Sequence, residues 1–576
     1  MATFLRAGTA GLAVLCLGAA PLAAQTSDGG LFGGQPYTGG VLPTFGNGTN
    51  VENLRPQLER YFNTATLPAV APTWVFDASL GVDVGVTDNA LRLAAPRRAD
   101  FFTVISPTLS ATGDTARFKT NLSYSPLVQV YATQGSQTRV SQYFNGRSLA
   151  IVVPDAVFVD VRGDVTQSSQ LGSGFNDGPS ANYNRQNQVQ TTSFSVTPYA
   201  EHRFGGWGTA RVGYSFARSL QDSDDRFNTV NLVGTNRGYG SIGNLTTQRE
   251  RASFATGENF GRVNDLTVAE AIQYSGTGSY SDAHRNQIFS QLGYALTRKV
   301  TLLGGLGYQD IVYSGSRTGG VRDDGIRINE PTWNTGVRYT PNADSTITVL
   351  YGRRDGSANV SFEGQFAPTA RTRVIGRYST GITSDLEGAQ DVLATTSVGP
   401  GGFVTDTVTG APVGTGGGGF GVQNGVYRVK RLSLTGLLLA ARDSYSVTLT
   451  QEDRTTLSTS VSPFTGAVIP NGTSGTSLYV SGSWSHELAP DMTSNVSVQY
   501  GTTNNTSQFL GTAGNGGRQD TVSFSAALSK QFTATLSGTV RYTFTDQFGA
   551  RGNTLSRYNA GNYTENILLV GLRKGF

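Results

Sequence analysis

The feature that most constrains this chain is an alternation of apolar and polar residues at period two, repeated in many short segments. Residues 521–545, "TVSFSAALSKQFTATLSGTVRYTFT", show it clearly: Val522 and Phe524 alternate with serines up to a turn near Lys530, and the alternation resumes beyond the turn up to Phe544. Successive side chains of a β-strand point to opposite faces, so each segment predicts a strand with one apolar and one polar face. The pair predicts a hairpin with a tight turn.

Short turns and long connections alternate along the chain. Hairpin turns are predicted at residues 295–301, 339–346, 440–446 and 486–493, whereas long Gly/Asn/Asp/Thr-rich connections are predicted at residues 171–188, 221–262, 383–425 and 505–518. This asymmetry is typical of outer-membrane barrels, which have short periplasmic turns and long extracellular loops. We therefore predict an all-β fold, a transmembrane antiparallel up-and-down β-barrel of about 20 strands, with a range of about 18 to 22. A separate strand in residues 262–285 would make the number of strands odd, whereas an even number is expected. These residues are therefore assigned to a loop or to an extension of the following strand.

The composition distinguishes a membrane barrel from a soluble β-sandwich, whose strands would also alternate apolar and polar residues. Only 15% of the residues are charged, against roughly 25% in soluble domains, and the polar faces carry mainly Ser, Thr, Asn and Gly. A sandwich that faces water would carry many Lys and Glu. Aromatic residues lie beside the predicted turns, among them Trp207, Trp333, Tyr339, Trp484 and Tyr542. Belts of Trp and Tyr at two lipid–water boundaries would produce this distribution.

The N-terminal part has a different character. Residues 1–24 match a cleavable signal peptide, with Arg6 before an apolar stretch and small residues up to Ala24. Residues 25–71 are Gly/Pro-rich and are expected to form a flexible periplasmic leader or, alternatively, a plug lodged in the lumen. Residues 72–576 are expected to form the barrel. Since Cys16 lies in the predicted signal, cleavage leaves a chain without cysteine. The predicted location is the Gram-negative outer membrane.

The predicted lumen face carries a modest excess of basic residues. If the apolar residues face lipid, the inward-facing charges are Arg117, Lys119, Arg162, Arg211, Arg338, Arg373, Arg377 and Arg541, with Asp83, Asp160 and Asp164. A pore lined by arginine favours anions through its fixed charge, and acidic sugars would be drawn toward it. The same arginines could instead pair with acids and stiffen a large barrel, and the sequence leaves both interpretations open.

No catalytic, cofactor or metal site is predicted. Catalysis needs a nucleophile and a base within hydrogen-bond reach, and the chain contains only three histidines, at His202, His284 and His486, which are interpreted as solvated or interfacial. Asp323, Asp324 and Glu330 could hold a cation at an outer loop, although a solvated loop is the favoured interpretation. We therefore predict a protein that is not an enzyme, with no nucleic-acid partner.

The first predicted strands carry an ordered set of short motifs. They comprise a "T-D-N" turn, an acidic residue before "ISP" and a strand containing a tyrosine, supplied here by Thr87, Asp88, Asn89, Asp100, Ile105, Ser106, Pro107 and Tyr124. In this the chain resembles the outer-membrane β-barrel porins associated with exopolysaccharide and PEP-CTERM (exosortase) loci. The resemblance implies an outer-membrane barrel involved in polysaccharide export or envelope organisation, with polysaccharide-export components as partners. It supplies no catalytic residues.

The C-terminal segment "ILLVGLRKGF" has the form of a final barrel strand. Leu568, Val570, Leu572 and Phe576 fall on one face at period two, and a terminal Phe on such a strand resembles the signal read by the barrel-assembly machinery. Lys574 departs from that pattern, but its ammonium can snorkel to the headgroups. Membrane lipid and lipopolysaccharide are the other expected partners.

The leading functional hypothesis is a porin-like channel or envelope component with a weakly anion-favouring lumen, linked to exopolysaccharide export. The alternative is a surface interaction or structural barrel that acts through its long loops and has a blocked lumen.

Overall fold

The computed structural model describes most of the predicted barrel. The described residues are 55, 73–169, 188–223, 243–276, 278–315, 317–318, 321–322, 325–398, 404–406, 420, 425–461, 468–470, 472, 474–506, 517–549 and 562–576. The predicted signal peptide, nearly all of the leader, Asp323 and Asp324 lie outside them. Within the described ranges, no helix is both long enough and apolar enough to cross a membrane.

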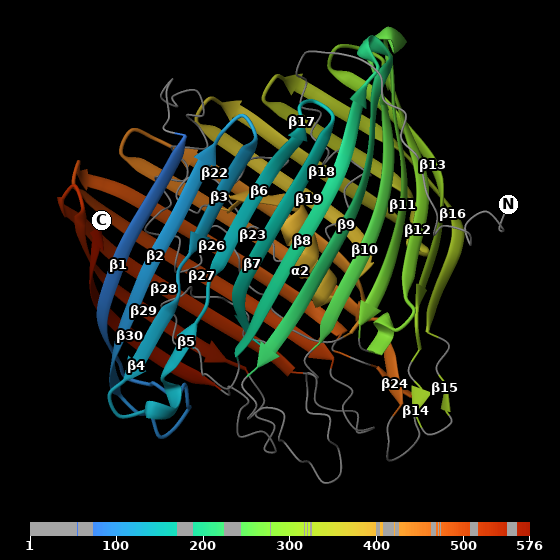
Figure 1. The fold of residues 1–576 in the computed structure, drawn as a ribbon. Helices are drawn as coiled ribbons and strands as arrows, with labels where there is room; N and C mark the ends of the chain where they lie inside the picture. Colours follow the sequence, from blue (N-terminus) through green and yellow to red (C-terminus); the bar gives the residue numbers. More distant parts are fainter. Residues whose placement is uncertain are drawn as a thin grey trace.

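One large antiparallel sheet dominates the fold (Figure 1). Its principal strands are β1 (Trp74–Thr87), β2 (Asp100–Asp114), β3 (Phe118–Tyr124), β6 (Phe144–Val153), β7 (Val157–Ser169), β8 (Gln188–Arg203), β9 (Gly208–Ser223), β10 (Asn244–Thr256), β11 (Val263–Gly276), β12 (His284–Ala295), β13 (Val300–Tyr313), β16 (Ile326–Asn342), β17 (Ser345–Arg354), β18 (Ser357–Thr369), β19 (Thr372–Thr383), β22 (Tyr427–Leu439), β23 (Asp443–Thr456), β26 (Ser474–Ala489), β27 (Met492–Thr506), β28 (Gly517–Thr533), β29 (Leu536–Phe548) and β30 (Tyr563–Gly575).

Smaller elements decorate this sheet. They are β4 (Leu127–Tyr131), β5 (Arg139–Ser141), the pairs β14 (Arg317–Thr318) with β15 (Val321–Arg322), β20 (Thr396–Val398) with β21 (Val404–Asp406) and β24 (Thr459–Val461) with β25 (Val468–Pro470), the helix α2 (Asp385–Thr395), and the short 3-10 turns η3 (Gly135–Gln137), η5 (Gly205–Trp207), η7 (Glu258–Phe260) and η8 (Gly278–Tyr280).

The sheet closes on itself. It contains 24 strands, of which β4 and β5 branch from β2, and the other 22 form a ring because β1 pairs with both β2 and β30. All pairings between described strands of the ring are antiparallel. The prediction of an all-β, closed antiparallel barrel is confirmed, and the strand number lies at the upper end of the predicted range.

Side chains alternate between a lipid-type outer face and a polar inner face. On β30, Leu568, Val570 and Leu572 point outward and are 46%, 52% and 55% exposed. The inner face of β28 carries the buried polar residues Thr521, Ser523 and Ser525, whereas the inward-facing Ile567 and Leu569 of β30 are apolar exceptions. Phe576, directly after the strand, is also exposed. The outer faces of most strands repeat this pattern, so the barrel presents an apolar band that suits a hydrocarbon environment.

Aromatic side chains border the apolar band at both ends of the strands. Tyr294, Tyr339 and Trp484 are exposed near the short turns, and Tyr308 and Tyr351 are exposed near the opposite end. Rings with one apolar face and one polar group are favoured at lipid–water boundaries. The two belts therefore mark the expected levels of the membrane surfaces.

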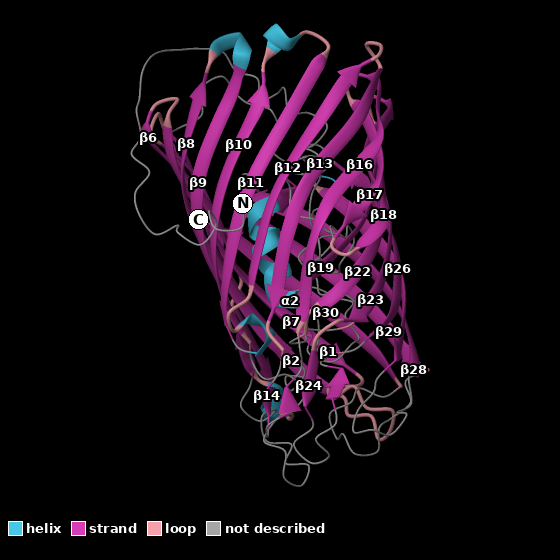
Figure 2. Ribbon diagram, turned by 90° about the vertical axis from the view of Figure 1, so that its right-hand side faces the viewer, coloured by secondary structure: helices cyan, strands magenta, loops and turns pink. Residues whose placement is uncertain are grey.

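Most of the short turns gather at one end of the barrel, which is uppermost in Figures 1 and 2. The two-residue turn Asp355–Gly356, between β17 and β18, lies at the other end. All five hairpins predicted from short turns are present, as β12–β13, β16–β17, β22–β23, β26–β27 and β28–β29. The turn of the last hairpin lies at residues 534–535 and not near Lys530. β1 begins and β30 ends at the short-turn end of the barrel, since Trp74 pairs with Gly113 and Ser79 with Gly575.

Two strands were missed by the sequence prediction. The segment 262–285, assigned to a loop, contains β11, and the predicted connection 221–262 contains β10; each pairs with its neighbours on both sides. Most of their outward positions are small or polar, for example Glu250, Asp265 and Ala269, with Phe254 as an exception, so the apolar contrast that identifies a membrane strand is weak there. These two strands are adjacent in the ring and explain why about 20 strands were predicted and 22 are present.

Two further segments differ from their predictions. Residues 115–131, whose continuous apolar–polar alternation predicts one strand, form the two strands β3 and β4. Both pair with β2, but on their other sides β3 pairs with β6 and β4 with β5. Pro126, which has no N–H for a ladder bond, lies between them. The first part of the connection 383–425, expected at the surface, instead forms helix α2 inside the barrel, because its side chains contact inward-facing groups of the wall.

The ring closure is reinforced by a buried ion pair at the seam. Glu565, inward-facing on β30, accepts a hydrogen bond from Arg92 Nε at 2.8 Å and another from Thr87 Oγ1 of β1 at 2.8 Å. On the outer side, Asn566 N donates to Asp88 Oδ1 at 2.7 Å. Polar contacts thus join the first and last strands on both faces.

We predict that Glu565→Ala destabilises the closed barrel by about 3–5 kcal/mol, because the buried Arg92 guanidinium loses its carboxylate. Urea unfolding of the reconstituted protein, followed by heat-modifiable gel mobility, measures this. Asp491→Ala removes the exposed Lys530–Asp491 pair (3.8 Å) and is the control, with an expected loss of at most about 1 kcal/mol. Equal losses in the two variants would refute the role of the seam pair.

Candidate functional site

Helix α2 leaves the barrel wall directly after β19. Ser384 Oγ accepts a hydrogen bond from Glu387 N at 3.2 Å, and Gly388 N donates to Ser384 O at 2.9 Å. Ser-x-x-Glu is the capping pattern that satisfies the free N–H groups of a first helical turn, and the acidic residues Asp385 and Glu387 suit the positive end of the helix dipole. The local sequence therefore starts a helix where a strand ends.

The helix lies within the lumen. It packs against the inner sides of β7, β8, β9 and β10. Figures 1 and 2 both show α2 enclosed by the strands of the barrel. Its apolar side chain Leu386 joins a buried cluster with Leu245, Ile272 and Ile311 of the wall and with Ile382. The inward fold is thus stabilised by apolar burial as well as by polar contacts.

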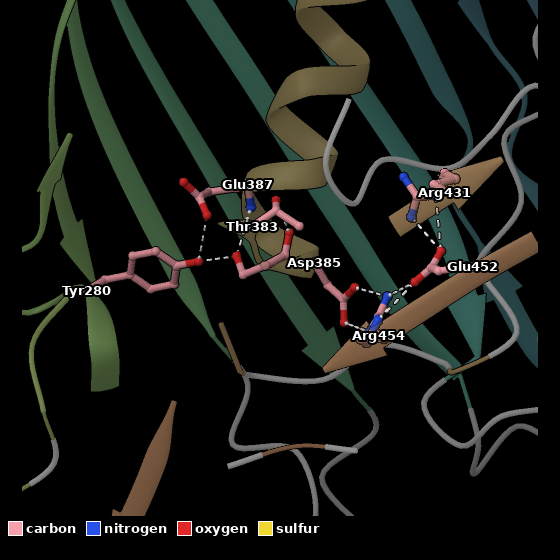
Figure 3. A network of polar contacts seen from close by, with 8 residues as sticks. Tyr280, Thr383, Asp385, Glu387, Arg431, Glu452 and Arg454 are labelled. Atoms are coloured by element: carbon pink, nitrogen blue, oxygen red, sulfur yellow. Dashed lines mark hydrogen bonds and ion pairs between the residues drawn. The ribbon is translucent and has the colours of Figure 1, made fainter. Parts of the chain in front are cut away.

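A first anchor joins the N-terminus of α2 to β23. Arg454 Nη2 lies 3.1 Å from Asp385 Oδ1 and 3.0 Å from Glu452 Oε1, and Arg431 of β22 pairs with the other oxygen of Glu452 (Figure 3). The Arg454 guanidinium also lies 4.6 Å from the ring centroid of Tyr427. These groups are nearly inaccessible to solvent, so their charges interact strongly.

A second anchor is phenolic. Tyr313 Oη donates to Glu387 Oε1 at 3.1 Å and Tyr280 Oη to Glu387 Oε2 at 3.4 Å, while Tyr280 also bonds Ser384 Oγ (Figure 3 shows Tyr280 with Glu387). Burial, together with the Glu387 carboxylate, raises the pKa of Tyr280 well above its usual value. Tyr280 therefore stays a neutral hydrogen-bond donor. Tyr274 completes this ring cluster, with its centroid 5.8 Å from those of Tyr280 and Tyr313.

A third anchor holds the C-terminal half of α2 to β10 and β7. Gln390 receives a hydrogen bond from Thr247 Oγ1 at 2.6 Å and donates to Leu245 O at 3.2 Å. Arg162 Nη1 donates to Leu393 O at 2.5 Å, which places a cation at the negative end of the helix. The helix is therefore fixed at both ends.

Asp391 of α2 has a raised pKa, and its protonation state affects how firmly the helix is docked. Burial raises its pKa from 3.8 to about 7, opposed by the positive charges of Arg249 and Arg285 and reinforced by the negative charges of Glu387 and Glu270. Its protonated form is thus favoured in the docked helix.

The opposite wall of the lumen is also covered. The inward-facing Ser444, Ser446 and Ser485, on β23 and β26, and Asn495 on β27 are at most 1% exposed. Side chains on the wall of a wide water-filled channel would be accessible to solvent. These four side chains are therefore covered by other groups of the protein.

The structure spreads the predicted lumen charges over many strands. Most of the arginines are engaged by acids: Arg162 with Asp160 (2.9 Å), Arg211 with Glu201 (2.8 Å), Arg373 with Asp344 (3.9 Å) and Arg377 with Glu363. Such pairing is what the stiffening interpretation expects, and it lowers the net charge available to a passing anion.

The remaining predicted residues are placed as follows. Asp164 accepts a hydrogen bond from Asn145 at 2.8 Å. Asp83, Arg338 and Arg541 lie at inward positions of β1, β16 and β29, Lys119 is exposed near the short-turn end of β3, and Arg117 lies in the β2–β3 turn, where it donates to Val152 O at 3.1 Å. Of the predicted set, Arg162 is a residue that bonds α2.

The three histidines lie apart from one another. His284 pairs with Asp310 at 3.2 Å and His486 with Asp443 at 2.9 Å, while the ring of His202 packs edge-on against Phe204. Glu330, considered as a cation ligand, is bonded by Arg353 and by Gly356 N. Within the described ranges, no three His, Cys, Asp or Glu side chains are grouped as a metal site.

Sequence reasoning missed the residues that hold α2. Tyr280, Tyr313 and Arg454 have no local motif that predicts contact with a helix from a distant loop. The one signal present was the Ser384–Glu387 capping pattern, which predicts a helix in the connection after β19 but not its inward direction.

The fold defines the class: a closed 22-strand antiparallel barrel of the outer-membrane type. No protein-family model and no curated protein matches the chain. Among solved structures it is similar to the FrpB iron transporter of Neisseria meningitidis (10% identity, 88% of this chain and 82% of that chain covered, TM-score 0.49). It is also similar to the ferric-catecholate import receptor Fiu of E. coli K12 (9%, 86% and 81%, 0.46) and to the alcaligin outer-membrane receptor FauA of Bordetella pertussis (16%, 88% and 77%, 0.41). These identities show a shared fold alone, and none of the comparisons supports the exopolysaccharide-associated family.

We predict that docking of α2 weakens as pH rises. The pKa of Asp391 is raised in the docked state, so its stabilising contribution is complete below about pH 4 and is lost as pH passes about 7. A nitroxide at Ala389 should be immobilised at pH 5 and more mobile at pH 8 by electron paramagnetic resonance. In Asp391→Asn the mobility of the label should be the same at pH 5 and pH 8. If the label in this variant becomes more mobile at pH 8, as in the wild type, the assignment to Asp391 is wrong.

Proposed function

We propose that this protein is a gated transport barrel of the outer membrane, closed at rest by α2. The observation that carries the proposal is that α2 is anchored to distant parts of the ring. Arg454 lies on β23 and Thr247 on β10; eight strands of the ring separate β10 and β23 in one direction and twelve in the other. A helix fixed in this way lies across the passage.

The anchors favour a removable closure over a permanent core. They consist largely of ion pairs and hydrogen bonds on a segment that belongs to a connection between strands, so α2 can leave without breaking the ladder of the barrel. A passive, permanently open channel does not fit the buried lumen wall. We propose at most a weak anion preference for the opened lumen, because most of the predicted arginines pair with acids.

One alternative is favoured by the same buried lumen wall. A surface interaction or structural barrel would keep α2 in place permanently and act through its long connections. The two functions differ in one respect: release of α2 opens a passage only in the transport barrel. The link to exopolysaccharide export rests on the sequence resemblance, and lipopolysaccharide, the assembly machinery and export components remain proposed partners.

We predict that Asp385→Asn combined with Gln390→Ala raises single-channel conductance in planar bilayers, because both ends of α2 lose an anchor. The wild-type protein should show rare or no openings. Glu201→Gln, which removes the partner of Arg211 near the short turns without contacting α2, is the matched control and should behave as wild type. If the double variant shows normal heat-modifiable gel mobility but no long-lived channel openings, the structural barrel is favoured.

Within the described ranges the leader is represented by Arg55, which contacts the barrel. Arg55 Nη2 donates to Ala441 O at 2.8 Å and lies 3.1 Å from Glu487 Oε2, at the short-turn end of β22 and β26. We propose that this ion pair tethers the leader, at Arg55, to the mouth of the barrel.

We predict that cysteines at Arg55 and Glu487 cross-link with a short bifunctional thiol reagent in isolated outer membranes. The predicted mature chain has no other cysteine, so the reaction reports on this pair. The pair Arg55→Cys with Asp344→Cys, on the turn between β16 and β17, is the control and should not cross-link. Equal yields from both pairs would show that the leader is not tethered at Glu487.

A further inference from the structure

The wall groups that hold α2 form a set suited to carboxylates. We call Arg249, Arg285, Arg454, Tyr280 and Tyr313 the α2 seat. Arg454 pairs with Asp385, the two phenols donate to Glu387, and the positive charges of Arg249 and Arg285 act on Asp391. The carboxylates of Asp385 and Glu387 are therefore matched by a cation and by hydroxyl donors of the wall. The Asp391 carboxyl group, which burial keeps largely protonated below its pKa of about 7, lies where the positive charges of Arg249 and Arg285 favour a more strongly charged acid.

The seat has donor capacity that α2 does not use. Arg285 is 2% exposed, and its Nη2 donates to Ile382 O at 3.0 Å, but its Nε is a buried donor with no hydrogen-bond partner among the described groups. The Nε of Arg249 likewise makes no hydrogen bond there and lies 3.5 Å from Glu270 Oε1. Buried donors without partners are costly, which indicates that the seat suits a more strongly accepting occupant.

The spacing of the helix carboxylates defines the kind of occupant. Asp385 and Asp391 are six residues apart, which corresponds to about 9 Å along a helix, with Glu387 between them. A solute that reproduces these contacts carries several carboxylates on a chain of similar length. Guanidinium and phenol groups together bind carboxylates by charge-assisted hydrogen bonds, whereas a neutral sugar would leave buried arginines without counter-charge.

We propose that α2 occupies the place of a solute, and that the α2 seat binds polycarboxylates. The inference rests on the proposed function, because binding of the solute displaces α2 and thereby opens the barrel. The ligand and the helix compete for the same arginines, so the closed state is also the state in which the site is occupied by the protein itself.

The test uses a variant in which the helix keeps its shape and loses its charge, Asp385→Asn with Glu387→Gln and Asp391→Asn. Fluorescent trigalacturonate should bind this variant at least about tenfold more tightly than the wild type, because the competing carboxylates are gone. Neutral maltotriose should bind the two proteins equally weakly. Adding Arg285→Gln to the variant should return trigalacturonate binding to the wild-type level.

Equal affinity of the charge-free variant for trigalacturonate and maltotriose would overturn the proposal. Tripolyphosphate serves as a third ligand, and tighter binding of it than of trigalacturonate would overturn the assignment to carboxylates. Since the variant could fail to assemble, a second measurement uses the wild-type sequence with a nitroxide at Ala389. Saturating trigalacturonate should mobilise the label and maltotriose should not; an immobile label with both would also overturn the proposal.

The failure of this inference is distinguishable from failure of the proposed function. If the anchor variants conduct but show no preference for polycarboxylates, the gate stands and the ligand class is wrong. If the anchor variants release α2 but show no conductance in the bilayer, the proposal that α2 is a gate is wrong.

Discussion

The structure depends on one constraint: in a bilayer every backbone N–H and C=O of a strand must find a partner within the protein. The pairing of β30 with β1 satisfies this constraint, since it leaves no open edge in the ring. The seam is therefore where the barrel becomes complete, and Glu565 with Arg92 fastens it from inside. A ring of this many strands also encloses more space than the side chains of its own wall can fill. The fold thus creates a need for something in the lumen.

Helix α2 occupies part of this space, and its acidic side chains also pair with charged and phenolic groups of the wall. In a poorly solvated interior an unpaired carboxylate is unfavourable, so the acidic side chains of α2 are stable only where the wall supplies arginines and phenols. The reverse also holds, because Arg454 without Asp385 would keep a single acid, Glu452, shared with Arg431. The docked helix and the charged sector of the wall therefore stabilise each other, and a competing anion is the natural means of separating them.

The class of fold could be predicted from alternation because the exposed side chains of strands such as β30 are apolar without exception in the middle of the strand. The prediction failed at β10 and β11, where Glu250 and Asp265 face outward and the period-two contrast disappears. The inward course of α2 could not be predicted, because it depends on contacts between Glu387 and tyrosines more than seventy residues earlier in the chain. The period-two alternation was enough to predict that the lumen arginines face inward. Their pairing with acids could not be predicted, because it depends on which strands lie next to one another.

The most direct test of the account is hydrogen–deuterium exchange of the α2 amides in the protein reconstituted in lipid. If the helix is fixed across the lumen at rest, the amides from residue 389 to residue 395 should exchange far more slowly than in an unstructured peptide, and the Asp385→Asn and Gln390→Ala changes should release that protection. Exchange of these amides at the unprotected rate in the wild-type protein would contradict the closed resting state.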